Sequence, residues 1–269
     1  MAVISRRGLL LGAGGVGLVG LAGWAVAPQR VERMLGLAPE PFVPDAPEGE
    51  VRLEQVTSAH LGEIDLLTAV PHGHGDGAGL PVVVALHGSS QSAASLPDFG
   101  LPRFVSAAVE AGAPPFVLAA TDDGPAGWVP DGDVDPQAML RDELPGWLSD
   151  RGFDAERRAL WGWSRGGYGA LRFLQAEADW ATALALYSPA MSPDDPAFDD
   201  LGVLRSVPWG LWCATDDPYS DASVALAERA PVGPEPWVQG TGGHTWVYWN
   251  DQTLDMFGWL AGSFASPTP

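Results

Sequence analysis

The sequence has no lysine and a single cysteine, and both shortages limit its chemistry. Cys213 has no partner in the chain for a disulfide, and without a Cys-x-x-Cys pair the sequence excludes thiolate zinc sites and dithiol redox chemistry. Basic residues are scarce: 14 arginines stand against 34 acidic residues, a net charge of −20. An acidic chain repels phosphate backbones, so nucleic acid is disfavoured as a partner. The lack of lysine, with 34 glycines and 25 prolines, fits a high-GC genome or a salt-adapted surface.

The remaining composition is that of a globular protein. Of the 269 residues, 46% are hydrophobic and only 18% are charged, which excludes disordered, collagenous and coiled-coil classes. This length corresponds to one large domain or two small ones. The sequence shows no internal repeat, so we assign residues 51–269 to a single domain.

The N-terminal segment, residues 1–27, has the pattern of a targeting signal. Arg6 and Arg7 stand directly before an uncharged run from Gly8 to Ala27. This arrangement predicts export by the twin-arginine route, and hence a secreted or cell-envelope protein. A membrane span is the alternative because the run is about 20 residues long, although its glycines make it weakly hydrophobic.

Removal of this signal stays open at the level of sequence. Ala25–Ala27 has the small-x-small form of a cleavage site, but the proline that follows hinders a signal peptidase. Cleavage after Ala22 and retention as an anchor are the alternatives. Residues 28–50 are rich in proline, which discourages regular structure and predicts a tether or a wrapping arm.

The domain begins with an antiparallel pattern. Val51–Thr57 and Leu61–Val70 alternate apolar and polar residues, as half-buried strands do, and a glycine-rich turn follows. His72, His74 and Asp76 lie in that turn. We interpret them as solvated turn residues rather than metal ligands, so the sequence predicts no metal site.

Beyond this start, apolar strands alternate with helices. Continuously apolar runs predict strands buried on both faces at Pro81–Leu86, Phe116–Ala120, Ala159–Trp161, Ala181–Tyr187 and Gly210–Ala214, and a short strand at Pro236–Val238. Helices are predicted at Phe104–Ala111, Pro136–Asp150, Gly166–Ala178, Ala222–Ala230 and Gln252–Phe264. The alternation predicts an α/β fold with a mostly parallel central sheet and helices on both faces. In such a sheet, chemistry collects beyond the carboxyl ends of the strands.

One strand end carries a catalytic pattern. Residues 162–166 have the form G-x-S-x-G, in which the flanking glycines allow a sharp strand-to-helix turn that lifts Ser164 out of the sheet. The pattern alone is weak evidence. A buried-type strand precedes it, however, and a helical segment follows it, so we predict Ser164 as a nucleophile.

A serine nucleophile needs an imidazole base and a carboxylate that orients the base. His244 is the one histidine after Ser164, and it follows several glycines in a loop, so it is the predicted base. Asp217 and Asp216 both lie beyond the end of the strand at 210–214. We favour Asp217, which stands before a proline where a turn begins, and keep Asp216 as the alternative.

Charge that develops on a substrate carbonyl oxygen needs backbone donors. The amide after the nucleophile, that of Arg165, is one candidate donor. The amide of Ser89, in the loop after the strand at 81–86, is the other. His87 and Gly88 would shape this loop, with His87 as a packed residue rather than a catalytic one.

At these residues the sequence resembles the α/β-hydrolase fold. Within that fold it is similar to the esterase branch that includes S-formylglutathione hydrolase (esterase D), feruloyl esterase-like proteins and the secreted mycolyltransferases. The resemblance covers about residues 51–265 and rests on Leu86–Ser90, Gly162–Leu171, Ser188–Ala190, Asp217–Pro218 and Gly243–Trp246 with Trp249. Arg165 departs from the pattern, since many members have methionine there.

We therefore expect an exported serine hydrolase that cleaves a carboxylic ester through an acyl-enzyme on Ser164, with no metal or organic cofactor. The expected partner is a small-molecule or lipid ester, with membrane contact only through a retained leader. Trp128, Gly88 and Trp163 are candidates for substrate contact. Two alternatives stay open: transfer of the acyl group to a sugar or lipid hydroxyl, and a non-catalytic envelope or binding protein on a hydrolase scaffold.

Overall fold

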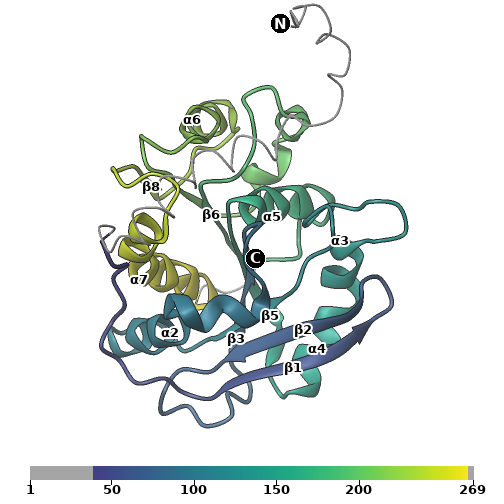
Figure 1. The fold of residues 1–269 in the computed structure, drawn as a ribbon, viewed down its shortest axis with the longest axis vertical. Helices are drawn as coiled ribbons and strands as arrows, with labels where there is room; N and C mark the ends of the chain where they lie inside the picture. The colour runs from purple at the N-terminus through teal and green to yellow at the C-terminus, as the bar shows by residue number, and fades with distance from the viewer. Residues whose placement is uncertain (1–38, 266–269) are drawn as a thin grey trace, which may run out of the picture. The chain divides into compact units, whose positions relative to one another are not determined.

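An eight-stranded sheet forms the centre of the protein, in a computed structural model that describes residues 39–265 (Figure 1). The strands are β1 Val51–Ser58, β2 Gly62–Ala69, β3 Pro81–Leu86, β4 Val117–Thr121, β5 Asp154–Trp163, β6 Leu184–Tyr187, β7 Trp209–Trp212 and β8 Trp237–Val238. Their order in the sheet is β1-β2-β4-β3-β5-β6-β7-β8. The pairs β1–β2 and β2–β4 are antiparallel and all others are parallel. The predicted antiparallel start and mostly parallel sheet are confirmed.

Helices connect the strands and cover both faces of the sheet (Figure 1). They are α2 Leu101–Glu110, α3 Pro136–Ala138, α4 Leu144–Asp150, α5 Arg165–Ala176, α6 Ser220–Arg229 and α7 Trp246–Gly262. One π-helical turn, Met139–Glu143, joins α3 to α4. Short 3₁₀ turns lie at Ala93–Phe99, Pro196–Asp199, Gly202–Arg205 and Ser263–Ala265.

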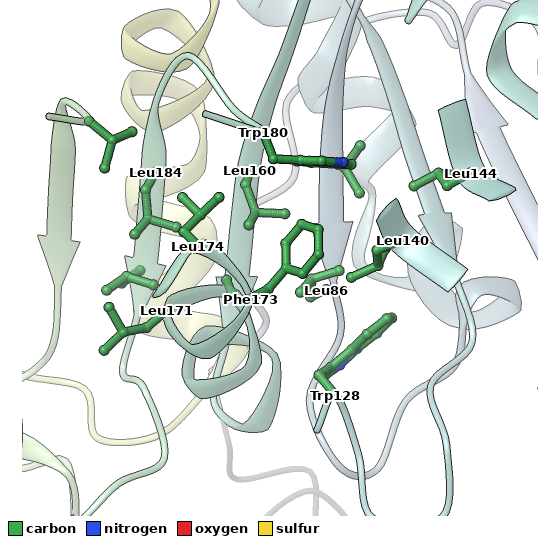
Figure 2. Close-up of a cluster of buried hydrophobic side chains, with 14 of the residues drawn as sticks. Leu86, Trp128, Leu140, Leu144, Leu160, Leu171, Phe173, Leu174, Trp180 and Leu184 are labelled. Atoms are coloured by element: carbon green, nitrogen blue, oxygen red, sulfur yellow. The ribbon is translucent and has the colours of Figure 1, made fainter. Parts of the chain in front are cut away.

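Two hydrophobic layers hold the helices to the sheet, because successive side chains of a strand point to opposite faces. In β3, Val82 and Val84 belong to the layer that includes side chains of α4 and α5. Val83 and Ala85 belong to the layer that includes side chains of α2 and α7. Figure 2 shows the first layer, where apolar side chains from helices and strands pack together. Strands β3, β4, β6 and β7 are therefore buried on both faces, as their apolar sequences indicated, whereas the edge strand β1 is mostly exposed.

The segment before β1 packs against the domain. The Phe42 ring meets Phe104 of α2 edge to face, with ring centroids 5.8 Å apart. Asn250 Nδ2 of α7 donates to the Phe42 carbonyl at 2.7 Å. The last part of the predicted proline-rich linker thus contacts both helices, whereas the predicted signal lies outside the described residues. In residues 39–265, every helix is too short or too polar to cross a bilayer.

Two elements begin five or more residues before their predicted starts. Helix α7 begins at Trp246 rather than near Gln252, because Thr245 caps it by accepting a hydrogen bond from the Tyr248 amide at 3.2 Å. Its first turn is aromatic on several faces, so no helical periodicity marked the start. Strand β5 also extends further back, since its polar first half continues the extended chain that leads into the buried stretch.

Candidate active site

Ser164 occupies a sharp turn between β5 and α5. Its backbone has φ 56° and ψ −122°, a conformation that costs a residue with a Cβ about 1–3 kcal/mol. A Cβ on Gly162 would overlap the Gly166 backbone, and a Cβ on Gly166 would overlap the Leu86 carbonyl at the end of β3. The Ser164 amide donates to the Tyr187 carbonyl of β6 at 2.8 Å. Glycine on both sides and the neighbouring strands therefore fix the strained turn.

The Ser164 side chain meets His244 and, through it, Asp217. His244 Nε2 lies 2.9 Å from Ser164 Oγ, and His244 Nδ1 lies 2.9 Å from Asp217 Oδ2. Ser164 and Asp217 are only 8% and 5% exposed, so both hydrogen bonds are shielded from water and strengthened by the low local dielectric. The structure thus brings together the three residues that the sequence analysis selected.

Asp216 points elsewhere and holds the loop that carries His244. Its Oδ1 accepts hydrogen bonds from the Gly242 and Gly243 amides, each at 3.0 Å. These bonds, of which the one from Gly243 has the larger effect, hold the pKa of Asp216 below its usual value. Asp216 is therefore placed as an anchor of the glycine loop, and Asp217 alone reaches the imidazole.

Aromatic rings surround the imidazole of His244. Tyr219 and Trp249 both contact it edge to face, with ring centroids at 5.1 and 4.7 Å. The Tyr219 amide also donates to Asp217 Oδ1 at 2.8 Å, and Trp249 Nε1 donates to Ser188 Oγ at 3.1 Å. Burial, with the charge of Asp217 adding to it, raises the pKa of Tyr219. Packing and hydrogen bonds thus hold the imidazole in one orientation.

The two candidate oxyanion donors belong to the nucleophile turn at the start of α5 and to the turn after β3, and these two turns lie in contact. Arg165 is the first residue of α5, where amides have no acceptor inside the helix. Ser89 is exposed in the turn after β3. In the same turn, a Cβ on Gly88 would stand 2.8 Å from Gln91 Oε1 and 3.0 Å from Trp163 Nε1. The turn that carries Ser89 therefore packs directly on the residue before the nucleophile.

The residues predicted to contact substrate lie in the core instead. Trp128 is 1% exposed and Trp163 is 0% exposed. Figure 2 shows Trp128 among the buried side chains of one face of the sheet. Its Nε1 donates to the His87 carbonyl at 2.9 Å, so the polar atom of the indole is satisfied inside the protein. The prediction of substrate contact was wrong for both tryptophans, and Gly88 is buried as well.

Sequence reasoning missed Asp123, which follows β4. Its Oδ2 lies 2.6 Å from Arg165 Nη2, and its Oδ1 lies 4.0 Å from His87 Nε2. Burial raises the pKa of Asp123 and lowers the pKa of His87. His87 Nδ1 lies 2.9 Å from the Gly88 carbonyl, the contact of a packed histidine. The sequence feature that could have indicated Asp123 is the acidic pair Asp122-Asp123, which directly follows a buried strand at the carboxyl edge of the sheet.

The glycine-rich turn between β2 and β3 stays at the surface. His72, His74 and Asp76 are exposed there. Within the part of the chain that the structure describes, no three His, Cys, Asp or Glu side chains are grouped so as to hold a metal ion.

Known proteins share this sequence pattern and fold. The model of the family described as "Putative esterase" matches residues 58–238. A comparison with curated protein sequences gives no match. Among solved structures, a ferulic acid esterase superposes with a TM-score of 0.70 at 20% identity, over 81% of this chain and 100% of its own.

Two further structures extend the comparison. An S-formylglutathione hydrolase from Agrobacterium tumefaciens superposes with a TM-score of 0.64 at 17% identity, over 82% of this chain and 98% of its own. An α/β-hydrolase enzyme from the metagenome of Lake Arreo gives 0.64 at 19% identity, over 90% of each chain. The chain belongs to the "Putative esterase" family and is a carboxylesterase-type hydrolase with the α/β-hydrolase fold.

Proposed function

We propose that the protein hydrolyses a carboxylic ester through an acyl-enzyme on Ser164, with His244 as the base and Asp217 as the residue that orients it. The observation that carries this proposal is the unbroken chain of hydrogen bonds from Ser164 Oγ through both imidazole nitrogens to Asp217, each link 2.9 Å long. With its proton on Nδ1 toward the carboxylate, the imidazole presents Nε2 as an acceptor for the hydroxyl proton.

The first half of the reaction acylates the enzyme. Ser164 Oγ attacks the carbonyl carbon while His244 Nε2 takes the hydroxyl proton, and the carbonyl electrons move to oxygen. The amides of Arg165 and Ser89 donate to this oxyanion, an interaction that is stronger in the transition state than in the bound substrate. As the ester C–O bond breaks, the imidazolium gives its proton to the leaving oxygen, and an alcohol departs.

The second half regenerates the enzyme. His244 takes a proton from a water molecule whose oxygen attacks the acyl carbon, and the second oxyanion meets the same two amides. When the bond to Ser164 Oγ breaks, the imidazolium returns the proton to the serine, and a carboxylic acid is released. In both halves the buried carboxylate of Asp217 faces the imidazolium and stabilises its charge.

The test is hydrolysis of p-nitrophenyl esters of increasing acyl length, with methyl ferulate added because one neighbour is a ferulic acid esterase. Turnover should be lost in Ser164→Ala and kept in Ser149→Ala, which alters an exposed serine of α4. Activity that survives in Ser164→Ala, or a folded wild type that hydrolyses no ester, would contradict the proposal. Added sugar or lipid alcohols report whether water or an alcohol accepts the acyl group.

The proposed location rests on the sequence alone. We infer export by the twin-arginine route from Arg6 and Arg7 ahead of the uncharged run. Replacing both arginines by lysine should hold the protein in the cytoplasm, as measured by cell fractionation. Unchanged export of that variant would contradict the twin-arginine route.

A further inference from the structure

We propose that the ion pair between Arg165 and Asp123 is a positioning device for the oxyanion site. It ties the loop after β4 to the turn of the nucleophile and so sets where the Arg165 and Ser89 amides stand. The inference rests on the proposed function, in which these two amides bind the oxyanion, and it assigns to the Arg165 side chain a role separate from that of its backbone.

The loop after β4, residues 122–128, contacts the loop that carries Ser89. Asp122 Oδ1 accepts a hydrogen bond at 2.9 Å from the amide of Ala93, the first residue of the 3₁₀ turn that follows this loop. At the other end of the segment, Trp128 Nε1 donates to the His87 carbonyl at 2.9 Å. The position of the loop that carries Ser89 therefore depends on segment 122–128.

The same segment contacts the nucleophile turn. Asp123 Oδ2 lies 2.6 Å from Arg165 Nη2. Gly127, at φ 84°, lies so close to Arg165 that a Cβ there would stand 2.6 Å from the Arg165 Cδ. One turn further along α5, a Cβ on Gly169 would overlap the Trp128 side chain. Segment 122–128 thus contacts both the start of α5, which carries the Arg165 amide, and the loop that carries the Ser89 amide.

The ion pair is well placed to hold this junction. The Asp123 side chain is 11% exposed and that of Arg165 is 29% exposed, so water screens the pair less than it screens a surface pair. The other titratable groups that influence Asp123 are His87, in the loop that carries Ser89, and Asp122, in segment 122–128. Removing one partner leaves the other charge uncompensated at the edge of the oxyanion site.

The effect on catalysis follows from the geometry of oxyanion stabilisation. Removing one oxyanion donor costs about 100- to 1,000-fold in kcat, and a displacement of about 1 Å costs about 100-fold. A variant without the ion pair still has both amides, but segment 122–128 no longer holds them in position. We therefore expect kcat to fall about 10- to 100-fold, with KM changed less than about threefold.

The experiment compares Arg165→Met, Asp123→Asn and the double variant with a matched pair of controls. Arg157→Met and Asp154→Asn break an ion pair of the same 2.6 Å length at the opposite end of β5. The readouts are kcat, KM and Tm, together with the inhibition constant of a trifluoromethyl ketone, whose adduct with Ser164 carries an oxyanion.

The expected result has three parts. Both single variants lose kcat, and the ketone binds more weakly by a similar factor. The double variant is no worse than the singles, because the two residues act as one unit. Arg165→Lys keeps the positive charge but not the planar guanidinium, so its kcat should lie between those of wild type and Arg165→Met. If Arg165→Met does not fold, Arg165→Lys takes its place in the test.

Several outcomes would overturn the inference. Unchanged kcat removes the positioning role, and a higher KM at constant kcat would mean that Arg165 binds substrate directly. If the control variants lose as much kcat, or if the loss of kcat follows a fall in Tm, the ion pair contributes only to the general stability of the fold. Failure of the proposed function has a different signature, because Ser164→Ala would then keep its activity or the wild type would have none.

Discussion

Replacing Asp217 by asparagine should nearly abolish catalysis while leaving the fold intact. The two carboxylate oxygens have different partners: Oδ2 lies 2.9 Å from His244 Nδ1, and Oδ1 accepts from the Tyr219 amide at 2.8 Å. If the asparagine oxygen keeps the Tyr219 amide, its NH₂ faces Nδ1 and forces the imidazole proton onto Nε2. That nitrogen then has no lone pair for the Ser164 hydroxyl. Turning the amide over instead would place two buried donors against each other, at a cost of about 1–3 kcal/mol.

The magnitude follows from this wrong tautomer. An equivalent substitution in a serine triad lowers kcat by about 10,000-fold, so we expect a loss of about 1,000- to 10,000-fold for Asp217→Asn, or about 4–5.5 kcal/mol in the activation free energy. The neighbouring carboxylate supplies the control. In Asp216→Asn the amide oxygen can still accept from Gly242 and Gly243, so kcat should change less than about threefold.

The assay is hydrolysis of a p-nitrophenyl ester by both variants, with circular dichroism and Tm to establish that each is folded. The reasoning is refuted if Asp216→Asn loses as much kcat as Asp217→Asn. It is also refuted if folded Asp217→Asn keeps more than about a tenth of the wild-type rate.

Three further predictions concern packing and titration. Gly169→Ala should lower the free energy of unfolding, measured in urea, by at least about 2 kcal/mol, because its Cβ would overlap Trp128. Gly258→Ala, which has open space around its Cβ in α7, should raise the free energy of unfolding by about 0.5–1 kcal/mol. Equal effects of the two substitutions would contradict the packing of Gly169 against Trp128. Burial raises the pKa of Cys213 to about 12, so a thiol reagent at pH 8 should react only after unfolding, and reaction of the native protein would contradict that burial. The pKa of Asp216 is lowered in the folded state, so its carboxylate stabilises the fold above about pH 4 and loses this effect as pH falls through the lowered pKa. The difference in urea midpoint between wild type and Asp216→Asn should therefore shrink in acid, and a constant difference would contradict the assignment.

The sequence was most informative where local chemistry determines structure. Apolar runs marked the parallel strands, since strands buried on both faces need them. Ser164 could be selected because its strained turn requires glycine on both sides, and His244 because no other histidine follows. Both features can be read from the sequence without a structure.

The features that the sequence left open or missed depend on contacts between distant segments. Asp216 and Asp217 leave the same strand end, and only the path of the returning glycine loop decides which carboxylate faces the imidazole. Trp128 lies in a loop, which suggested an exposed ring, but the loop folds over the sheet and fills its core. The pairing of Asp123 with Arg165 joins residues of different connections, so no local pattern records it.

The most direct test of the account is the identity of the residue that carries the acyl group. After reaction with an ester and a rapid acid quench, trypsin should release residues 159–165 as one peptide, in which Ser164 is the only hydroxyl side chain. The account predicts the acyl mass on this peptide in the wild type, and in Asp217→Asn at a far lower rate of formation. An active wild type with the acyl group on another peptide, or with no covalent acyl group when deacylation is slowed, would contradict it.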